Sequence, residues 1–455
     1  MTTLISANRK MTLGLALGVI ASRLLFLGHG YGTDPDAWRA VVAAQRLLET
    51  GVYVPSRSPG NPLVEYVLAA MLAIGLGSSF WIGLVTAILS GVAVALLYVI
   101  LWPLGPARAF AGSAAFAFTP AVYVAGLGAM DYLWGVTFFL AASLCASRRH
   151  VWPAAVLLGL AVAVRPTNVL TVIPVVRLLS VPPRRLVAPL CCAMLIALVF
   201  YLPEILALGT AVLRPADGAH NVLQGIHFGT VGLFGALGFV GVVIATVSAI
   251  RNRTDTVESE LLGRTDRWAI AGVVVFSLLF VVLPHESGYL LPALVGLYWL
   301  VCRHARTNAL WVMVSLLIIS CLLIKVDEKP GRTEFVRGPV LWEVHEQKER
   351  RCLADRLKTW LTRNEGYVAV GYFRPQLAVE MGRPYSDRIM YVVRPHDDGL
   401  RDTEFRFDEY PDIPTNPRGL RPGAELQVLD RALRQQNSAW PDNELPVLRL
   451  SDFCR

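Results

Sequence analysis

Asp34 and Asp36 stand two positions apart in a polar segment that follows the first apolar run, Met11–Leu27. Carboxylates so placed can bind a divalent cation, and one of them can take a proton from an acceptor hydroxyl. The alternative is a purely structural role, because Asp34 before Pro35 is typical of a helix N-cap and Asp36 would lie at the positive end of that helix. We predict that Asp34 and Asp36 are catalytic, and a Mg or Mn ion held by them is the one cofactor that the sequence indicates.

Two more charged residues lie where apolar runs begin or end. Asp131 opens the run Tyr132–Ala146, and an ionisable group at such a position indicates function unless it caps a helix. Arg165 precedes Pro166 in a turn between two short runs. An arginine suits a phosphate because it stays charged and donates paired hydrogen bonds, although it can also simply extend to the membrane surface.

The composition indicates a membrane domain that positions these groups. The 455 residues are 54% hydrophobic and only 17% charged, against about 25% charged in soluble domains. Of the 76 charged residues, 43 follow Lys325. We therefore predict a polytopic α-helical membrane domain over residues 1–325 and a soluble extracytoplasmic α/β domain over residues 326–455. The arginines gather in short loops between apolar runs, as topology signals do, so nucleic acid is excluded as a partner.

Eleven apolar runs are suited to membrane spans. They are Met11–Leu27, Phe80–Leu101, Ala109–Leu127, Tyr132–Ala146, Val151–Val164, Val169–Leu179, Leu186–Leu206, Thr230–Ile250, Trp268–Leu283, Tyr289–Val301 and Leu310–Ile324. The basic loops between them place the N-terminus in the cytoplasm. The stretch Leu63–Leu76 would put later basic loops on the wrong side if it crossed the membrane, so we predict an interfacial helix over residues 63–77.

The first outer loop, residues 28–62, is predicted to begin with an amphipathic helix that runs from Asp34 to Glu49 and ends at Gly51. Its buried face is predicted to carry Ala37, Val41, Ala44 and Leu48. In the tail we predict a helix over Leu341–Leu361, short strands at Tyr367–Gly371 and Met390–Val393, and a further helix over Ala424–Gln436. Cys352 and Cys454 could form a disulfide in an oxidising compartment, but two cysteines do not establish it.

Four short segments together resemble the GT-C superfamily of integral membrane glycosyltransferases. Thr33-Asp-Pro-Asp-Ala-Trp38 is similar to the Asp-x-Asp loop of GPI mannosyltransferases, and Ser56-Arg-Ser-Pro-Gly-Asn-Pro-Leu63 to a segment before the second span. Asp131 matches the second acidic position, and Pro284–Pro292 resembles a His-Glu-x-Arg-Tyr-x-x-Pro pattern. Protein O-mannosyltransferases, aminoarabinose transferases and oligosaccharyltransferase catalytic subunits share this layout.

The resemblance implies a polyprenyl-phosphate sugar as donor and an acceptor hydroxyl on a glycan, lipid or protein at the outer face of the plasma membrane, with inversion. It implies that Asp34 or Asp36 is the base, that Asp131 supports it and that Arg165 stabilises the leaving phosphate. The remaining donor contacts are expected from Arg39, Arg57, His285, Glu286 and Tyr289.

Gly288 departs from the resembled pattern, because it stands where arginine is usual. Either another arginine takes over that contact or the donor differs. A transporter or flippase for a lipid-linked substrate is one alternative, although it predicts ionisable groups at the bilayer midplane and inverted repeats. An inactive scaffold of envelope assembly is the other.

Overall fold

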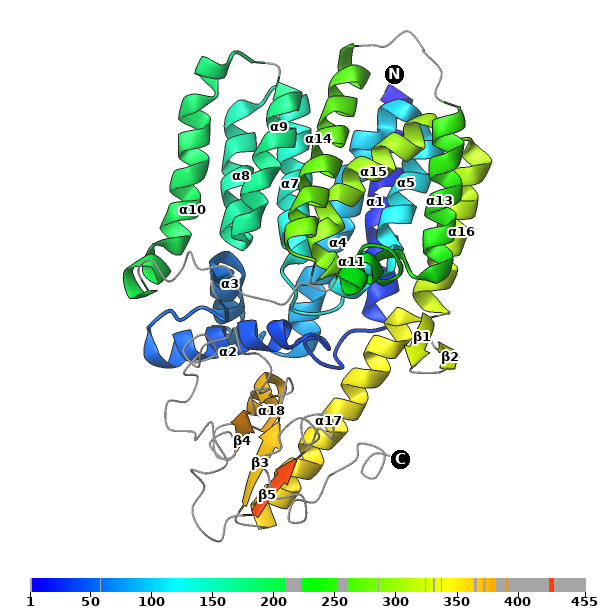
Figure 1. Cartoon of the computed structure of the whole chain (residues 1–455). Coiled ribbons are helices and arrows are strands. Elements are labelled where there is room, and N and C mark those ends of the chain that lie inside the picture. Colours follow the sequence, from blue (N-terminus) through cyan, green and yellow to red (C-terminus); the bar gives the residue numbers. More distant parts are fainter. Residues whose placement is uncertain are drawn as a thin grey trace.

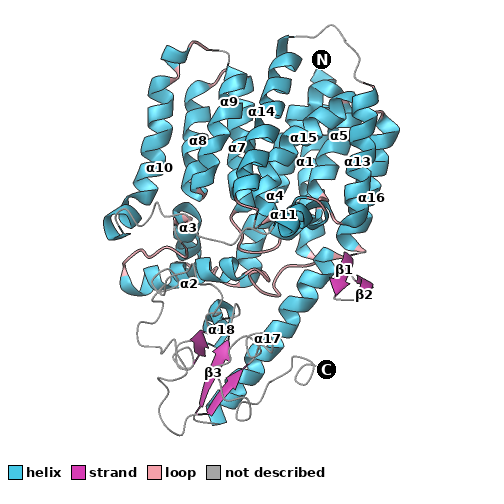
Figure 2. Ribbon diagram, viewed as in Figure 1, coloured by secondary structure: helices cyan, strands magenta, loops and turns pink. Residues whose placement is uncertain are grey.

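The computed structural model describes residues 2–57, 59–179, 181–208, 222–252, 260–284, 286–323, 325–329, 332–336, 338–363, 366–370, 374–381, 389–391 and 425–428. A bundle of helices forms the larger part, with the N-terminus at its upper end in Figure 1. Strands and a long helix lie beyond the lower end, coloured by type in Figure 2. The prediction of a mostly helical protein is confirmed.

The predicted apolar runs form the helices of the bundle. They are α1 (Thr2–Leu24), α4 (Ser79–Leu101), α5 (Pro106–Ala117), α6 (Pro120–Ala125), α7 (Tyr132–Ser147), α8 (Val151–Val164), α9 (Val172–Leu179), α10 (Val187–Leu208), α11 (Val222–Gly229), α12 (Val231–Phe234), α13 (Ala236–Arg251), α14 (Glu260–Val282), α15 (Leu291–His304) and α16 (Thr307–Leu322). Short 3-10 turns are η1 (Trp102–Leu104), η2 (Pro166–Thr171), η3 (Pro183–Arg185) and η5 (Ser287–Leu290).

Three helices of the described chain are long and apolar enough to cross a membrane alone: Ser79–Leu104, Pro183–Leu206 and Leu262–Val282. A bent pair, Gly225–Phe234 with Ala236–Arg251, would be a fourth if it counts as one span. These helices embed the protein in a membrane. The count of 11 spans stays a prediction, because most of the other helices, α1 with its 23 residues apart, are shorter than a full crossing needs.

Two of the runs that we predicted as spans are broken into two helices each. Ala109–Leu127 divides into α5 and α6 just before Pro120, since the proline ring disfavours helical backbone at the preceding residue. Thr230–Ile250 divides at Gly235, whose φ of 66° is left-handed and ends α12. The two arms on either side of Gly235 meet at 89°.

Large aromatic side chains fill the centre of the bundle. The rings of Phe139 and Trp268 stack 6.0 Å apart, and both are buried. Small residues let the helices approach: a Cβ on Gly159 would lie 2.7 Å from the carbonyl oxygen of Ala193 on α10. Close backbone contact of this kind is typical of helices packed in membranes.

Below the bundle, α2 (Pro35–Thr50) and α3 (Pro62–Ala73) pack against each other (Figure 1). The predicted helix is confirmed as α2, with Asp34 as N-cap and Gly51, at φ 69°, as C-cap. Ala37, Val41 and Ala44 are buried as predicted. Leu48 is not, because the helix packs through Leu47 in its last turn, which leaves Leu48 46% exposed.

The tail begins with a hairpin of β1 (Lys325–Lys329) and β2 (Arg332–Val336), which we did not predict. The long predicted helix is confirmed as α17 (Pro339–Arg363). It is followed by β3 (Gly366–Val370), α18 (Arg374–Met381) and β4 (Ile389–Tyr391). Cys352 on α17 is disulfide-bonded, while Cys454 lies outside the described residues.

The last described strand corrects one prediction. Residues 425–428 lie within the helix expected over Ala424–Gln436, but they form β5 (Glu425–Val428). β5 pairs in parallel with β3, which also pairs in parallel with β4, so the sheet order is β4-β3-β5. The alternation of Leu426 and Val428 with polar neighbours suits a strand, and pairing with β3 outweighs the helical pattern.

Candidate active site

Asp34 lies in the first outer loop and is the N-cap of α2. Its backbone is extended (φ −73°, ψ 125°), and its side chain accepts a hydrogen bond from the backbone N–H of Asp36 at 2.8 Å. Pro35 at the first helical position fixes the start of the helix. Within the described chain that backbone N–H is the one hydrogen-bond partner of the Asp34 side chain, so a carboxylate oxygen is left for a ligand.

Asp36 is committed to two arginines. Its Oδ1 receives a hydrogen bond from Arg39 Nη1 at 2.9 Å, one turn along α2. Its Oδ2 pairs with Arg57 Nη1, from the proline-containing segment that follows α2. Both carboxylate oxygens are therefore used in ion pairs.

A buried glutamate shapes the segment that carries Arg57. Glu65, in the first turn of α3, accepts hydrogen bonds from the Tyr53 hydroxyl at 2.5 Å and from the backbone N–H of Ser56 at 3.1 Å. It also binds the Ser56 hydroxyl. Burial raises the pKa of Glu65, while these hydrogen bonds act in the opposite direction. The segment is thus tied to α3 on one side and to Asp36 on the other.

Asp131 and Arg165 form the centre of the site. Asp131 precedes α7 and Arg165 follows α8, so the antiparallel pair of helices brings them together. Arg165 Nε lies 2.8 Å from Asp131 Oδ2, and Arg165 Nη2 lies 3.3 Å from Asp131 Oδ1. Arg57 Nη2 reaches the same carboxylate at 3.6 Å.

Asn61 joins this network. With its amide nitrogen toward Asp131, Asn61 donates to Oδ2 at 3.2 Å, and its oxygen accepts from Arg57 Nη2 at 3.3 Å. Asp131 is only 4% exposed, and such a buried carboxylate needs partners of this kind.

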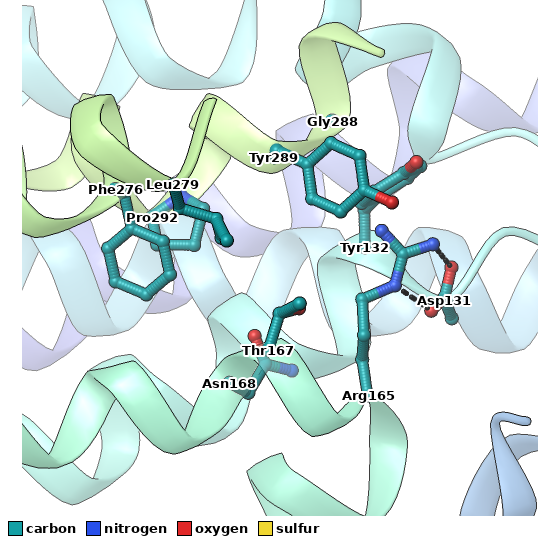
Figure 3. A pocket seen from close by; sticks show the side chains of 10 residues that line it. All are labelled: Asp131, Tyr132, Arg165, Thr167, Asn168, Phe276, Leu279, Gly288, Tyr289 and Pro292. Carbon is teal, nitrogen blue, oxygen red and sulfur yellow. Dashed lines mark hydrogen bonds and ion pairs between the residues drawn. The ribbon is translucent and has the colours of Figure 1, made fainter. Parts of the chain in front are cut away.

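Two tyrosine rings hold the guanidinium of Arg165. Its Cζ lies 4.2 Å from the ring centre of Tyr132 and 5.0 Å from that of Tyr289 (Figure 3). Gly288 makes room for this arrangement, because a Cβ there would overlap the ring of Tyr132. The space that a side chain at position 288 would need is thus filled by an aromatic ring that supports Arg165.

A pocket opens beside this cation. Asp131, Tyr132, Arg165, Thr167, Asn168 and Tyr289 give it a polar side, whereas Phe276, Leu279 and Pro292 give it an apolar side (Figure 3). Three buried polar atoms at or near it have no hydrogen-bond partner within the described chain: Arg165 Nη1, Tyr132 Oη and Glu286 Oε2. Unpaired buried polar atoms are rare in proteins, and here they indicate a ligand.

Burial sets the protonation of the two other acids of the site. It raises the pKa of Asp34, although Arg57, Arg39 and Arg165 act in the opposite direction. The pKa of Glu286 is also raised, by burial and then by the nearby charges of Asp34 and Asp131. A carboxyl group with a raised pKa is suited to proton transfer near neutral pH.

A divalent cation does not fit between Asp34 and Asp36. Both oxygens of Asp36 face arginines, whose charge opposes a cation, and Asp34 uses one oxygen as a helix cap. Among the described residues, no group of three or more His, Cys, Asp or Glu side chains could hold a metal ion.

The structure brings most of the predicted site residues to one place. Direct contacts join Asp36, Arg39, Arg57, Asp131, Arg165 and Tyr289, while Asp34 and Glu286 lie close enough to influence each other's pKa. His285 lies outside the described residues. Sequence reasoning missed Tyr132 and Asn61, although both stand inside the segments that carry the resemblance.

No protein-family model matches this sequence, and no curated protein sequence matches it. Solved structures do. The apo crystal structure of ArnT from Cupriavidus metallidurans matches with a TM-score of 0.57 and 12% identity, over 98% of this chain and 90% of that chain.

The ArnT structure bound to undecaprenyl phosphate matches with a TM-score of 0.52 and 14% identity, over 85% of this chain and 86% of that chain. The apo oligosaccharyltransferase of Archaeoglobus fulgidus matches at 0.45 and 12% identity, over 84% of this chain and 64% of that chain, which is too distant to carry an argument. This chain therefore has the fold of ArnT.

Proposed function

We propose that the protein is a glycosyltransferase that moves a sugar from a polyprenyl-phosphate donor to an acceptor hydroxyl, with inversion at the anomeric carbon. The observation that carries the proposal is the unpaired Nη1 of Arg165, held by two tyrosines at a pocket that is polar on one side and apolar on the other. A phosphate joined to a hydrocarbon chain has both characters. The fold of ArnT, solved with undecaprenyl phosphate, supports the same ligand class.

The phosphate would bind to Arg165 Nη1 and the Tyr132 hydroxyl, which are both buried donors without partners in the described chain. Asp131 binds the Nε and Nη2 edge of the guanidinium at 2.8 Å and 3.3 Å, so the cation is already oriented before a ligand arrives. Such preorganised donors stabilise charge that develops on a leaving group. Arg165 thus makes the phosphate contact that an arginine at position 288 would make in the resembled pattern.

Asp34 suits the general base better than Asp36 does. Both oxygens of Asp36 are held in ion pairs with Arg39 and Arg57, whereas Asp34 keeps one carboxylate oxygen for the acceptor. The raised pKa of Asp34 also makes it a stronger proton acceptor than an ordinary aspartate. Asp36 instead fixes Arg57, which reaches Asp131.

The reaction would be a single displacement. The acceptor oxygen forms a bond to the anomeric carbon while its proton passes to Asp34. The bond between that carbon and the phosphate oxygen breaks, and its electron pair leaves with the polyprenyl phosphate. Arg165 faces the negative charge that grows on this phosphate, and one displacement inverts the anomeric centre.

The membrane topology belongs to the same proposal. Eleven spans with a cytoplasmic N-terminus put every basic loop in the cytoplasm and the site at the outer face of the plasma membrane. The segments that we predicted on that face do meet: the N–H of Ala129 donates to the carbonyl of Tyr31 at 2.7 Å, and α17 contacts the first outer loop. The tail, residues 326–455, would then be extracytoplasmic.

The test is donor consumption. Purified protein in lipid nanodiscs would be incubated with a panel of radiolabelled polyprenyl-phosphate sugars, with the variants Asp34→Asn and Arg165→Ala beside wild type. The exposed Glu49→Gln, on the same helix as Asp36, is the matched control. We expect wild type and Glu49→Gln to consume one donor and both site variants to lose the activity.

A binding measurement with a polyprenyl phosphate distinguishes the role of Arg165 in holding the phosphate from the role of Asp34 as the base. Arg165→Ala should weaken binding, whereas Asp34→Asn should bind normally without turnover. If wild type binds the lipid phosphate but consumes no donor of the panel, the transferase proposal is overturned in favour of a transporter or a scaffold.

A further inference from the structure

Helix α17 of the tail grips the residue that precedes the proposed base. Glu343 accepts hydrogen bonds from the backbone N–H of Thr33 at 2.7 Å and from its hydroxyl at 2.5 Å. Arg350, two turns further along α17, donates to the backbone carbonyl of Thr33 at 2.5 Å. Every polar group of Thr33 is therefore bound by α17.

Both gripping side chains are themselves held in place. Gln347 donates to Glu343 at 2.8 Å, and Arg350 donates to Glu346 at 2.9 Å. Glu343 is only 4% exposed, so its charge is buried beside the loop. Burial raises the pKa of Glu343, and the hydrogen bonds from Thr33 and Gln347 and the charge of Arg350 partly offset the rise.

Helix α2 and the turn between α3 and α4 also hold this loop. The Tyr31 hydroxyl donates to the carbonyl of Gly77 at 2.6 Å, and the Trp38 indole N–H donates to the carbonyl of Gly32 at 2.7 Å. Gly30 lies against both Trp38 and Gln347, so a side chain there would meet each of them. Residues 30–33 are thus held by α17, by α2 and by the turn between α3 and α4.

We propose that α17 is a positioning helix of the active site, in which Glu343 and Arg350 set the place of Asp34 through Thr33. This inference rests on the proposed function to the extent that it takes Asp34 as the base. The tail then completes the catalytic site and is not merely attached to it.

The physical reason is the short covalent path. Arg350 binds the carbonyl of the peptide unit that joins Thr33 to Asp34, and this planar unit includes the Cα of Asp34. A shift of about 1 Å in a positioned catalytic group can lower a rate by about 100-fold. The grip on Thr33 therefore controls whether the Asp34 carboxylate reaches an acceptor hydroxyl.

The key experiment compares matched substitutions at both ends of the contact. Glu343→Gln keeps the size of the side chain but removes its charge, and Thr33→Val removes the hydroxyl. We expect each to lower kcat by about 10- to 100-fold with the KM for the lipid donor nearly unchanged. Thr33→Ser should rescue kcat, because it restores the hydroxyl. Thr359→Val, at an exposed position of α17 whose hydroxyl bonds only within the helix, should match wild type.

Two readouts exclude a general loss of structure. The acidic limb of the pH profile of kcat should move in Glu343→Gln, because Asp34 changes its distance from the arginines that lower its pKa. The Thr33→Val/Glu343→Gln double variant should be no worse than the stronger single variant, as expected for two groups in one contact. An effect on protein stability alone would shift neither quantity.

Amide hydrogen exchange over residues 28–40 tests the inference without any substrate. We expect faster exchange there in Glu343→Gln and Thr33→Val, with the exchange of α7 and α8 unchanged. If wild type consumes no donor, the proposed function fails and exchange alone decides the positioning role. If Glu343→Gln and Thr33→Val keep wild-type exchange, the positioning inference is overturned. With an active wild type, unchanged kcat in both variants also overturns it.

Discussion

Replacing Gly288 by alanine should damage the site through the ring of Tyr132. A Cβ at position 288 would overlap three carbon atoms of that ring, which is packed between the η5 turn and Arg165. Because the ring cannot shrink, it must move away from position 288. The movement changes its place beside the guanidinium of Arg165, whose Cζ now lies 4.2 Å from the ring centre.

The expected size follows from two terms. Extra atoms in a packed region cost about 1–3 kcal/mol of stability. Displacing the ring removes part of a cation–π contact that is worth about 0.5–2 kcal/mol. If that contact orients Arg165 toward the phosphate, its loss lowers kcat/KM by about 2- to 30-fold, since about 1.4 kcal/mol corresponds to a factor of ten.

The assay measures thermal unfolding in nanodiscs and donor consumption on the same samples. Gly272→Ala is the matched control, because a Cβ on Gly272 in α14 would meet no atom within 4 Å. The double variant Gly288→Ala/Tyr132→Leu should regain stability, since the overlap is gone, but not activity, since the ring is gone as well.

Gly288→Arg extends the test to the residue that the resembled pattern carries. We expect it to be at least as damaging as Gly288→Ala, because Arg165 and Tyr132 already occupy the space. The reasoning is refuted if Gly288→Ala unfolds at the wild-type temperature with wild-type kcat/KM, or if Gly288→Arg is more active than wild type.

Four further predictions concern charges. Asp34→Asn should lower kcat by about 10²- to 10⁴-fold, whereas Asp36→Asn should be less severe and should weaken donor binding through Arg57. The acidic limb of kcat/KM should lie above the pH range of an ordinary aspartate, because burial raises the pKa of Asp34 and the base must be deprotonated; Asp34→Asn abolishes this limb. Burial raises the pKa of Glu380 on α18 to about 7, so the stability that it contributes is complete below about pH 4.5 and lost as the pH rises through 7. Between pH 4 and pH 8 the unfolding temperature should therefore fall less in Glu380→Gln than in the control variant Glu49→Gln. EDTA should leave turnover unchanged, as measured by donor consumption, because Asp34 and Asp36 do not fit a divalent cation.

Local patterns predicted the elements that carry the site. The Asp34-Pro35 cap and Gly51 fixed both ends of α2, and the apolar runs predicted α7 and α8 closely. Asp131 and Arg165 stand at the facing ends of these two helices. The sequence therefore predicted the elements that place them. The predicted metal site did not follow, because the pairing of Asp36 with Arg57 depends on how a later loop folds back.

The sequence could not predict contacts between segments that lie far apart in the chain. Tyr132 against Gly288 is a packing event with no periodic or motif signal, since it joins two turns that the chain alone does not relate. The same holds for β5, where a pattern suited to a helix became a strand because β3 offered a partner. Tertiary context overrides local propensity in such cases.

The bond between Thr33 and Glu343 joins residues 310 positions apart. During synthesis, the Asp34 loop emerges early, whereas α17 follows only after the whole bundle has been made. The loop therefore cannot take its final position until the first half of α17, which carries Glu343 and Arg350, has been made and lies beside it. Under the proposed function, a chain that stops before α17 would insert into the membrane without turning over a donor, so activity would begin only once α17 has been made.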